Sequence, residues 1–263
     1  MDLGLKDRAV FIGGASAGLG KACAAAFARE GCSLMLVARR EDELRKLAEE
    51  LKTSTKARIG FIAADLSTAK GVEKAVASTL DAYGRIDVVF TNTGGPPPGT
   101  FFDHEEATWV AAFEQLLMSV VRICRLVIPH MKRQQWGRII NDTSIAVKEP
   151  LDNLILSNVF RTAVVSLAKS ISREVARYNI LVNNICPGFH ATTRMEEVIR
   201  SRAKRTGASY DDALAAVLKD VPLGRLLQPD ELASLVVFLA SEKASGITGT
   251  SILVDGGLAR GLM

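Results

Sequence analysis

The chain lacks the patterns that mark several large classes of protein. Its 263 residues include only four cysteines, which lie far apart without CxxC or Cys/His spacing, so neither a zinc site nor a disulfide framework is indicated. The amino-terminal stretch has no basic segment followed by a long apolar run, so we expect no signal peptide. The longest apolar runs, such as LASLVVFLA, are far too short for a membrane span. We therefore expect a cytoplasmic protein with reduced thiols, no metal and no membrane partner.

Strong charge of one sign is also missing. The net charge is +4, and the basic residues are mostly interleaved with acidic ones. The densest basic cluster, RSRAKR over residues 200–205, is best interpreted as a solvated helix face. The alternative is that it holds an acidic group of a substrate. Because no aromatic interleaving or docking motif accompanies the charge, we expect no nucleic-acid partner.

Short apolar runs alternate with helix-like stretches along the whole chain, and 48% of its residues are hydrophobic. The apolar runs are hydrophobic throughout, which is typical of parallel strands buried on both faces. Alternation at this spacing predicts an α/β fold with a doubly wound parallel sheet of the Rossmann type, in three α/β/α layers. We expect strands at 8–14, 32–38, 57–65, 86–92, 137–144, 180–188 and 250–257, and helices at 18–31, 41–53, 71–84, 105–131, 152–177 and 231–241.

No linker or repeat divides the sequence, so residues 1–263 are predicted to form one dinucleotide-binding domain. One polar segment, about 189–222, interrupts the alternation and is expected to form two helices that close over a ligand. Ser209 with Asp212 is similar to a capping box for the second of these helices.

A glycine-rich turn follows the first predicted strand, in the sequence GGASAGLG. Glycines permit a tight turn and let the backbone approach a pyrophosphate, while the next helix supplies N–H groups and a positive dipole end. The context of strand, turn and helix favours a cofactor site over a plain turn. The candidate phosphate-binding residues are Gly14, Ser16, Ala17, Gly18, Leu19 and Gly20.

The end of the second predicted strand bears on the choice of cofactor. A carboxylate there would bind the ribose 2′-hydroxyl of NAD, but the residues are Ala38, Arg39 and Arg40. Arg39 can pair with the 2′-phosphate of NADP, although the alternative is that Arg39 and Arg40 merely precede a charged helix. We therefore predict NADP(H), with NAD(H) as the less favoured cofactor.

These motifs resemble the short-chain dehydrogenase/reductase family along nearly the whole chain, with the 3-oxoacyl-acyl-carrier-protein reductase branch the most similar. GGASAGLG is similar to the family's TGxxxGxG motif, TNTGG to its NNAG motif and CPGFHATT to its PG motif. The resemblance implies that further residues contact the cofactor's adenine and nicotinamide ends: Asp65, Leu66, Asn92, Gly94, Pro187, Gly188 and Thr192.

The catalytic end departs from the family pattern of Asn, Ser, Tyr and Lys. The resemblance places Ser144 at the Ser position, Ser157 at the Tyr position, Arg161 at the Lys position and Leu116 at the Asn position. An alcohol is a poor acid near neutrality, and arginine is effectively always protonated. Arg161 can still donate to ribose hydroxyls or to an anionic oxygen, with Ser157 one helical turn away. The alternative is that the two residues only brace the ribose or a loop.

Hydride transfer at such a centre needs a proton from elsewhere. His190, directly after the PG motif, is the first candidate because its pKa suits acid–base work. Lys148, Glu149 and Tyr210 are weaker candidates. Asp142, which is unusual among apolar neighbours, is interpreted as a structural carboxylate with satisfied hydrogen bonds.

Three functions stay open. The first is an NADP(H)-dependent oxidoreductase acting on a small carbonyl or alcohol substrate with Ser144, Ser157, Arg161 and His190 as its site. The second is a catalytically inactive dinucleotide-binding relative that acts as a sensor or oligomer subunit. The third is an isomerase or lyase that uses the same pocket. The resemblance also implies a homotetramer, with the closing segment 256–263 at an interface.

Overall fold

The computed structural model describes residues 2–261, so Met1 and the last two residues of the closing segment lie outside the described residues. Seven parallel strands form one sheet in the order β3-β2-β1-β4-β5-β6-β7. The winding direction reverses between β1 and β4, which is where ligands bind in sheets of this kind. The predicted doubly wound fold is confirmed. The strands are β1 Ala9–Gly13, β2 Ser33–Ala38, β3 Ile59–Ala63, β4 Val88–Thr91, β5 Gly137–Asp142, β6 Ile180–Pro187 and β7 Ser251–Val254.

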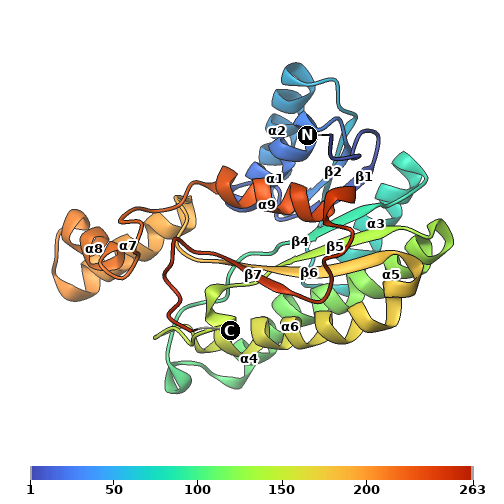
Figure 1. Cartoon of the computed structure of the whole chain (residues 1–263). Helices are drawn as coiled ribbons and strands as arrows, with labels where there is room; N and C mark the ends of the chain where they lie inside the picture. Colours follow the sequence, from blue (N-terminus) through green and yellow to red (C-terminus); the bar gives the residue numbers. More distant parts are fainter. Residues whose placement is uncertain (1, 262–263) are drawn as a thin grey trace.

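Helices cover both faces of the sheet and give three layers (Figure 1). Alternate strand residues point to opposite faces, so each strand contributes side chains to the hydrophobic core on either face of the sheet. On β5, Ile140 packs in the core under α1, α2 and α9, whereas Ile139 packs in the core under α3, α5 and α6. The helices of the first face are α1 Gly18–Arg29, α2 Glu41–Ser54 and α9 Pro229–Ala240; those of the second are α3 Ala69–Tyr83, α5 Ser119–Gln134 and α6 Ile155–Val175.

The helix predicted over 105–131 is not one regular helix. A π-helical turn, Glu114–Met118, joins α4 (Glu106–Phe113) to α5. The Ser119 hydroxyl donates to the Gln115 carbonyl at 2.7 Å, which is a local side-chain bond that competes with the helical ladder. Hydrophobic periodicity cannot reveal such a turn, since the apolar stripe continues on both sides. Turns of this type occur frequently at functional sites.

The segment after β6 forms two helices, as predicted, and they stand away from the sheet (Figure 1). These are α7, Thr193–Thr206, and α8, Tyr210–Leu218, which share a small core of their own. Ser209 begins α8 by accepting the Asp212 backbone N–H at 3.1 Å. The predicted capping box is incomplete, because the Asp212 carboxylate accepts the Ser209 hydroxyl rather than its backbone N–H.

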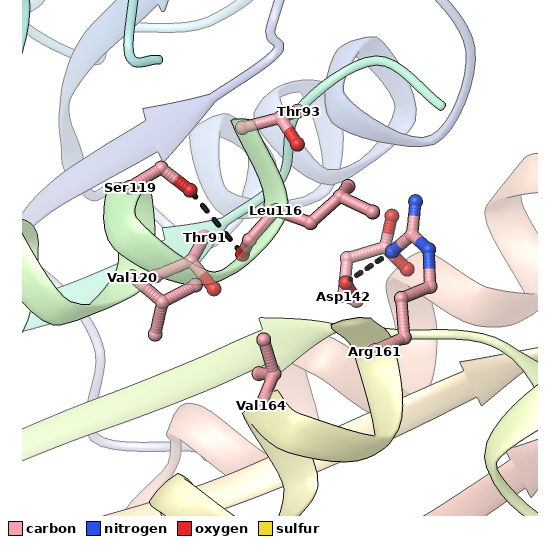
Figure 2. Close-up of a pocket in the computed structure, with 8 residues that line it drawn as sticks. All are labelled: Thr91, Thr93, Leu116, Ser119, Val120, Asp142, Arg161 and Val164. Carbon is pink, nitrogen blue, oxygen red and sulfur yellow. Dashed lines mark hydrogen bonds between the residues drawn. The ribbon is translucent and has the colours of Figure 1, made fainter. Parts of the chain in front are cut away.

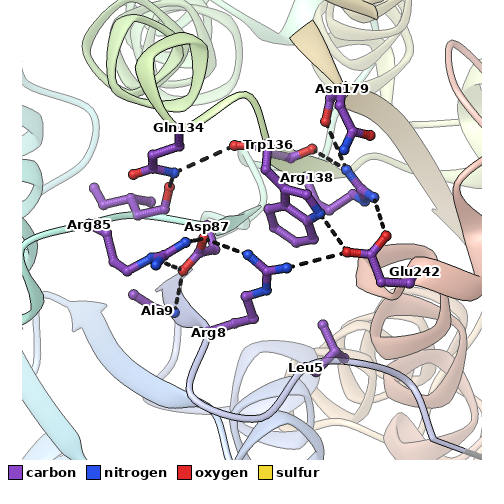
Figure 3. A network of polar contacts seen from close by, with 12 residues as sticks. Leu5, Arg8, Ala9, Arg85, Asp87, Gln134, Trp136, Arg138, Asn179 and Glu242 are labelled. Atoms are coloured by element: carbon purple, nitrogen blue, oxygen red, sulfur yellow. Dashed lines mark hydrogen bonds and ion pairs between the residues drawn. The ribbon is translucent and has the colours of Figure 1, made fainter.

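A network of charged and aromatic side chains closes the sheet at the amino-terminal ends of the strands (Figure 3). The Trp136 ring lies between the guanidinium groups of Arg8 and Arg138, 3.8 and 4.2 Å from its centroid. Glu242 accepts the indole N–H at 2.7 Å and pairs with both arginines. Burial lowers the pKa of Arg138 to about 10. This network ties β5 to the segment after α9, at the end of the sheet remote from the predicted cofactor site.

Candidate active site

The glycine-rich turn has the backbone geometry that phosphate binding requires. Gly14 and Gly18 have φ values of 60° and 54°, a region that side chains disfavour. A Cβ on Gly20 would overlap the Gly14 carbonyl, so the turn leaves no room there. Ala17 precedes α1 and offers no side-chain cap, and the first turn of α1 holds no acidic residue. The N–H groups of this helix end are therefore available to a phosphate, and the site fits a dinucleotide.

Arg40, rather than the predicted Arg39, is the arginine that reaches the glycine-rich turn. Its Nη2 donates to the Ser16 hydroxyl at 3.2 Å, which brings a cation to the turn beside the end of β2. Arg39 is also exposed, but its side chain makes no hydrogen bond with any residue from 2 to 261. Side chains at the end of β2 thus supply positive charge and no carboxylate.

The other predicted cofactor residues follow β3, β4 and β6, so they lie along the same edge of the sheet. Asn92 packs against the turn, since a Cβ on Gly14 would stand 2.7 Å from its Nδ2. Gly188 binds Val254 of β7 through its backbone. Thr192 caps α7 by accepting the Met195 N–H at 3.2 Å. Asp65 accepts hydrogen bonds from the backbone N–H and the hydroxyl of Ser67. The Gly94 carbonyl accepts a hydrogen bond from Gln115. Leu66 is buried, and Pro187 is the last residue of β6.

Arg161 and Ser144 lie at the carboxyl end of β5, and Ser157 lies one helical turn before Arg161 on α6. Arg161 Nη1 donates to the carbonyl oxygens of Asp142 and Thr143 at 2.7 and 2.8 Å, which ties α6 to the strand. Ser144 follows directly, and its hydroxyl accepts a backbone N–H two residues on at 3.1 Å. Ser157 lies in the first turn of α6 and is 7% exposed. Within residues 2–261 its hydroxyl makes no hydrogen bond, so this group is available to a ligand.

A small cavity lies beside Arg161 (Figure 2). Its volume is about 10 Å³, which is the space of one water molecule. Asp142 and Arg161 point toward each other at its wall, and Leu116 closes it from the π-helical turn. The lining residues are Thr91, Thr93, Leu116, Ser119, Val120, Asp142, Arg161 and Val164.

The structure corrects the interpretation of Asp142 as a satisfied structural carboxylate. Its Oδ1 is buried and has no hydrogen-bond partner in the described part of the chain. Burial raises the pKa of this carboxyl to about 6, although the Arg161 charge acts in the opposite direction. A carboxyl with this pKa exchanges protons near neutrality.

His190, the acid candidate from sequence, lies after β6 and is 4% exposed. Its Nδ1 lies 3.3 Å from the Gly188 carbonyl, and its Nε2 has no partner in residues 2–261. Burial lowers its pKa, so the imidazole is neutral at pH 7. It does not line the cavity beside Arg161. Among the weaker candidates, Glu149 accepts the Arg260 N–H, Tyr210 lies under Arg200 at the start of α8, and Lys148 is half-buried.

Comparison with known proteins agrees with this geometry. The family model described as enoyl-(acyl carrier protein) reductase matches residues 14–259. NADPH-dependent reductase BacG of Bacillus subtilis (strain 168) is 33% identical over 257 residues, covering 96% of this chain and 98% of its own. The chain belongs to the short-chain dehydrogenase/reductase family. The resemblance predicted from the motifs is thereby confirmed.

Other members of the short-chain dehydrogenase/reductase family show the same extent of similarity. The 3-oxoacyl-[acyl-carrier-protein] reductase FabG of Chlamydia muridarum (strain MoPn / Nigg) is 31% identical over 255 residues, covering 97% of this chain and 98% of its own. The crystal structure of L-sorbose reductase from Gluconobacter frateurii, complexed with NADPH and L-sorbose, superposes with a TM-score of 0.95. It is 33% identical, and each chain is covered completely.

Sequence reasoning about this family member overlooked the polar wall of the cavity. Thr91 ends β4 and opens the TNTGG segment, but the resemblance gave it no role, and Ser119 begins α5 outside any motif that the resemblance supplies. Asp142 carried a usable signal, because an acid at the carboxyl end of an apolar strand lies where ligands bind. No helix within residues 2–261 combines the length and apolar character that crossing a bilayer demands.

Proposed function

We propose that this short-chain dehydrogenase/reductase is an NADP(H)-dependent oxidoreductase that interconverts a carbonyl compound and its alcohol. The observation that carries the choice of cofactor is the contact of Arg40 with Ser16, which presents a guanidinium to the phosphate-binding turn. The reductase relatives support it, since BacG is named as NADPH-dependent and the sorbose reductase binds NADPH. The bound nicotinamide would exchange a hydride with the substrate carbon.

The proposed centre differs from the family's usual one. Ser144 and Ser157 hydrogen-bond the substrate oxygen, and Arg161 orients the ribose and stabilises negative charge. Arg161 donates hydrogen bonds to two carbonyl oxygens at the carboxyl end of β5. These bonds fix the position of the guanidinium, which supports this role. His190 is a poorer proton donor near neutrality than the sequence indicated, because burial lowers its pKa and leaves the imidazole neutral. The helices α7 and α8 act as a lid on this single domain.

We further propose a cytoplasmic homo-oligomer, with a tetramer as the form implied by the resemblance. Exposed aromatic side chains support self-association, since water-exposed apolar patches of this kind mark interfaces. Phe102 is 92% exposed and Phe101 61% exposed. Contacts between aromatic rings connect Phe101 through Trp109 and Phe160 to Phe113 at the end of α4.

Calorimetric titration with NADPH and, separately, NADH tests the cofactor proposal. We expect micromolar binding of NADPH and weak binding of NADH. Arg40→Ala should weaken NADPH about 10-fold, since one charge-assisted contact is worth about 1.5 kcal/mol, and should leave NADH unchanged. Arg45→Ala is the matched control, because Arg45 lies in α2, which begins directly after its N-cap Arg40, and pairs with Glu41 instead of the turn. Binding of neither cofactor would remove the oxidoreductase proposal.

The double change Ser157→Tyr with Arg161→Lys separates an active enzyme from an inactive relative. Both forms would be assayed for NADPH oxidation against ketone, sugar and acyl-thioester carbonyls. If the parent turns over and the change only alters its rate, the oxidoreductase proposal holds. If only the double variant turns over, the parent is a binding relative whose centre has lost its acid.

A further inference from the structure

Carbonyl reduction needs an acid as well as a hydride, and the centre described above has none in the usual place. The substrate carbon gains a hydride, and the substrate oxygen gains a proton. Ser157 is an alcohol, which is a poor acid near neutrality, and the guanidinium of Arg161 does not give up its proton. If this chain is the reductase proposed above, another group must hold the proton.

Asp142 is the acid that the fold brings to this place. It is the last residue of β5, and Arg161 donates to its backbone carbonyl at 2.7 Å. Its side chain lies at the wall of the one-water cavity, with the Arg161 guanidinium beside it (Figure 2). Thr91 and Ser119 add hydroxyl groups to the same wall. The cavity is therefore polar enough to hold a water with several partners.

The buried oxygen of this carboxyl takes no part in holding the described structure together. Asp142 Oδ1 has no hydrogen-bond partner within residues 2–261, which is costly for a buried carboxylate and much less so for a protonated carboxyl. An acid with a buried oxygen that has no structural partner, facing a cavity at the carboxyl end of a strand, is the arrangement expected of a functional group rather than a brace.

The titratable groups around Asp142 come from three elements, namely α6, α1 and β6. Arg161 on α6 is the cation that faces it. Its other titratable neighbours are the thiols of Cys23 on α1 and Cys186 on β6, and burial raises the pKa of both. Those thiols are neutral at pH 7. The protonation state of Asp142 therefore decides whether the Arg161 charge is compensated, and burial raises the pKa of the carboxyl to about 6.

We propose that Asp142 holds the proton that this centre delivers during carbonyl reduction, and that a water in the cavity beside Arg161 passes it toward the substrate oxygen. The inference rests on the proposed oxidoreductase function, in which NADPH supplies the hydride. As the carbonyl carbon gains the hydride, the O–H bond of the carboxyl breaks and a new O–H bond forms on the substrate oxygen, through water. Solvent then reprotonates the carboxylate. In alcohol oxidation, the same group takes the proton up.

The kinetic test compares the parent chain with Asp142→Asn from about pH 5 to pH 9, with NADPH and the carbonyl compound that the parent reduces fastest. We expect kcat/KM of the parent to fall about tenfold per pH unit above the pKa of the carboxyl. Asp142→Asn should lower kcat by about 100-fold or more and remove this limb of the profile. Asp81→Asn, which removes an exposed acid on α3, is the matched control and should reproduce the parent.

Two measurements besides activity accompany the kinetics. Calorimetry of Asp142→Asn with NADPH should give the parent's affinity within about threefold, which shows that the site is intact. Carbon-13 NMR of the side-chain carboxyls, with the Asp142 resonance identified by its loss in Asp142→Asn, should give a midpoint near pH 6.

The outcomes separate the two proposals. An unchanged rate and pH profile in Asp142→Asn, or an Asp142 resonance that titrates in the ordinary aspartate range, overturns the role of Asp142 alone. A parent that binds NADPH but reduces no carbonyl overturns the oxidoreductase proposal, and with it the delivery of a proton to substrate. In that case the NMR midpoint still decides whether the carboxyl holds its proton near neutrality.

Discussion

Replacing Asp142 with Asn should make the chain more stable above neutrality and should leave its stability nearly unchanged in acid. Burial raises the pKa of this carboxyl to about 6, against an ordinary value of about 3.9 in an unfolded chain. The folded state therefore binds the proton more tightly than the unfolded state does. A difference of roughly two pKa units corresponds to about 3 kcal/mol, since each unit is worth about 1.36 kcal/mol.

The direction of the effect follows from linkage. Below about pH 4 the carboxyl is protonated in both states, and ionisation costs nothing. Between about pH 4 and the folded pKa of about 6, the unfolded chain has released its proton while the folded chain still holds it, so unfolding becomes more favourable as the pH rises. The parent loses up to about 3 kcal/mol of stability across this window, whereas Asp142→Asn, which has no proton to lose there, does not.

Urea unfolding of both proteins at several pH values between about pH 3.5 and pH 8 measures the difference directly. Other acids titrate alike in the two proteins, so their contributions cancel in the difference. A difference of the expected size moves the melting temperature by roughly 6–10 °C in a chain of this length. If the two stability curves run parallel across the whole range, Asp142 titrates normally in the folded chain and the reasoning from burial is wrong.

Two further substitutions test the turn and the charged network. Gly20→Ala places a Cβ against the Gly14 carbonyl, so we expect NADPH affinity to fall at least about 10-fold by calorimetry, while Gly246→Ala, which meets nothing within 4 Å, should bind like the parent. Glu242→Ala removes the only carboxylate that pairs with buried Arg138 in residues 2–261, and should cost about 2 kcal/mol in urea unfolding. Glu242→Gln, which keeps an acceptor, should recover part of that loss; an equal loss in both variants would show that charge rather than hydrogen bonding matters.

The sequence was a good guide where local chemistry decides structure. Apolar runs that are hydrophobic throughout can only be buried on both faces, and their alternation with amphipathic stretches predicted the parallel sheet. The glycine-rich turn was equally clear, because Gly14, Gly18 and Gly20 stand between a strand and a helix. Helix ends were less certain: α6 begins at Ile155 rather than at Asp152. The π-helical turn was missed because the apolar stripe continues on both sides of residues 114–118 and hydrophobic periodicity does not register the change.

The sequence by itself therefore determined the fold, the phosphate-binding turn and the absence of a carboxylate at the end of β2, since each follows from residue type and order. Tertiary structure alone decided which arginine reaches the turn, because Arg39 and Arg40 are neighbours and only their directions distinguish them. The tertiary structure also decided the pKa of the Asp142 carboxyl. A pKa depends on burial and on nearby charge, and residues 142 and 161 come together only when α6 packs on the end of β5.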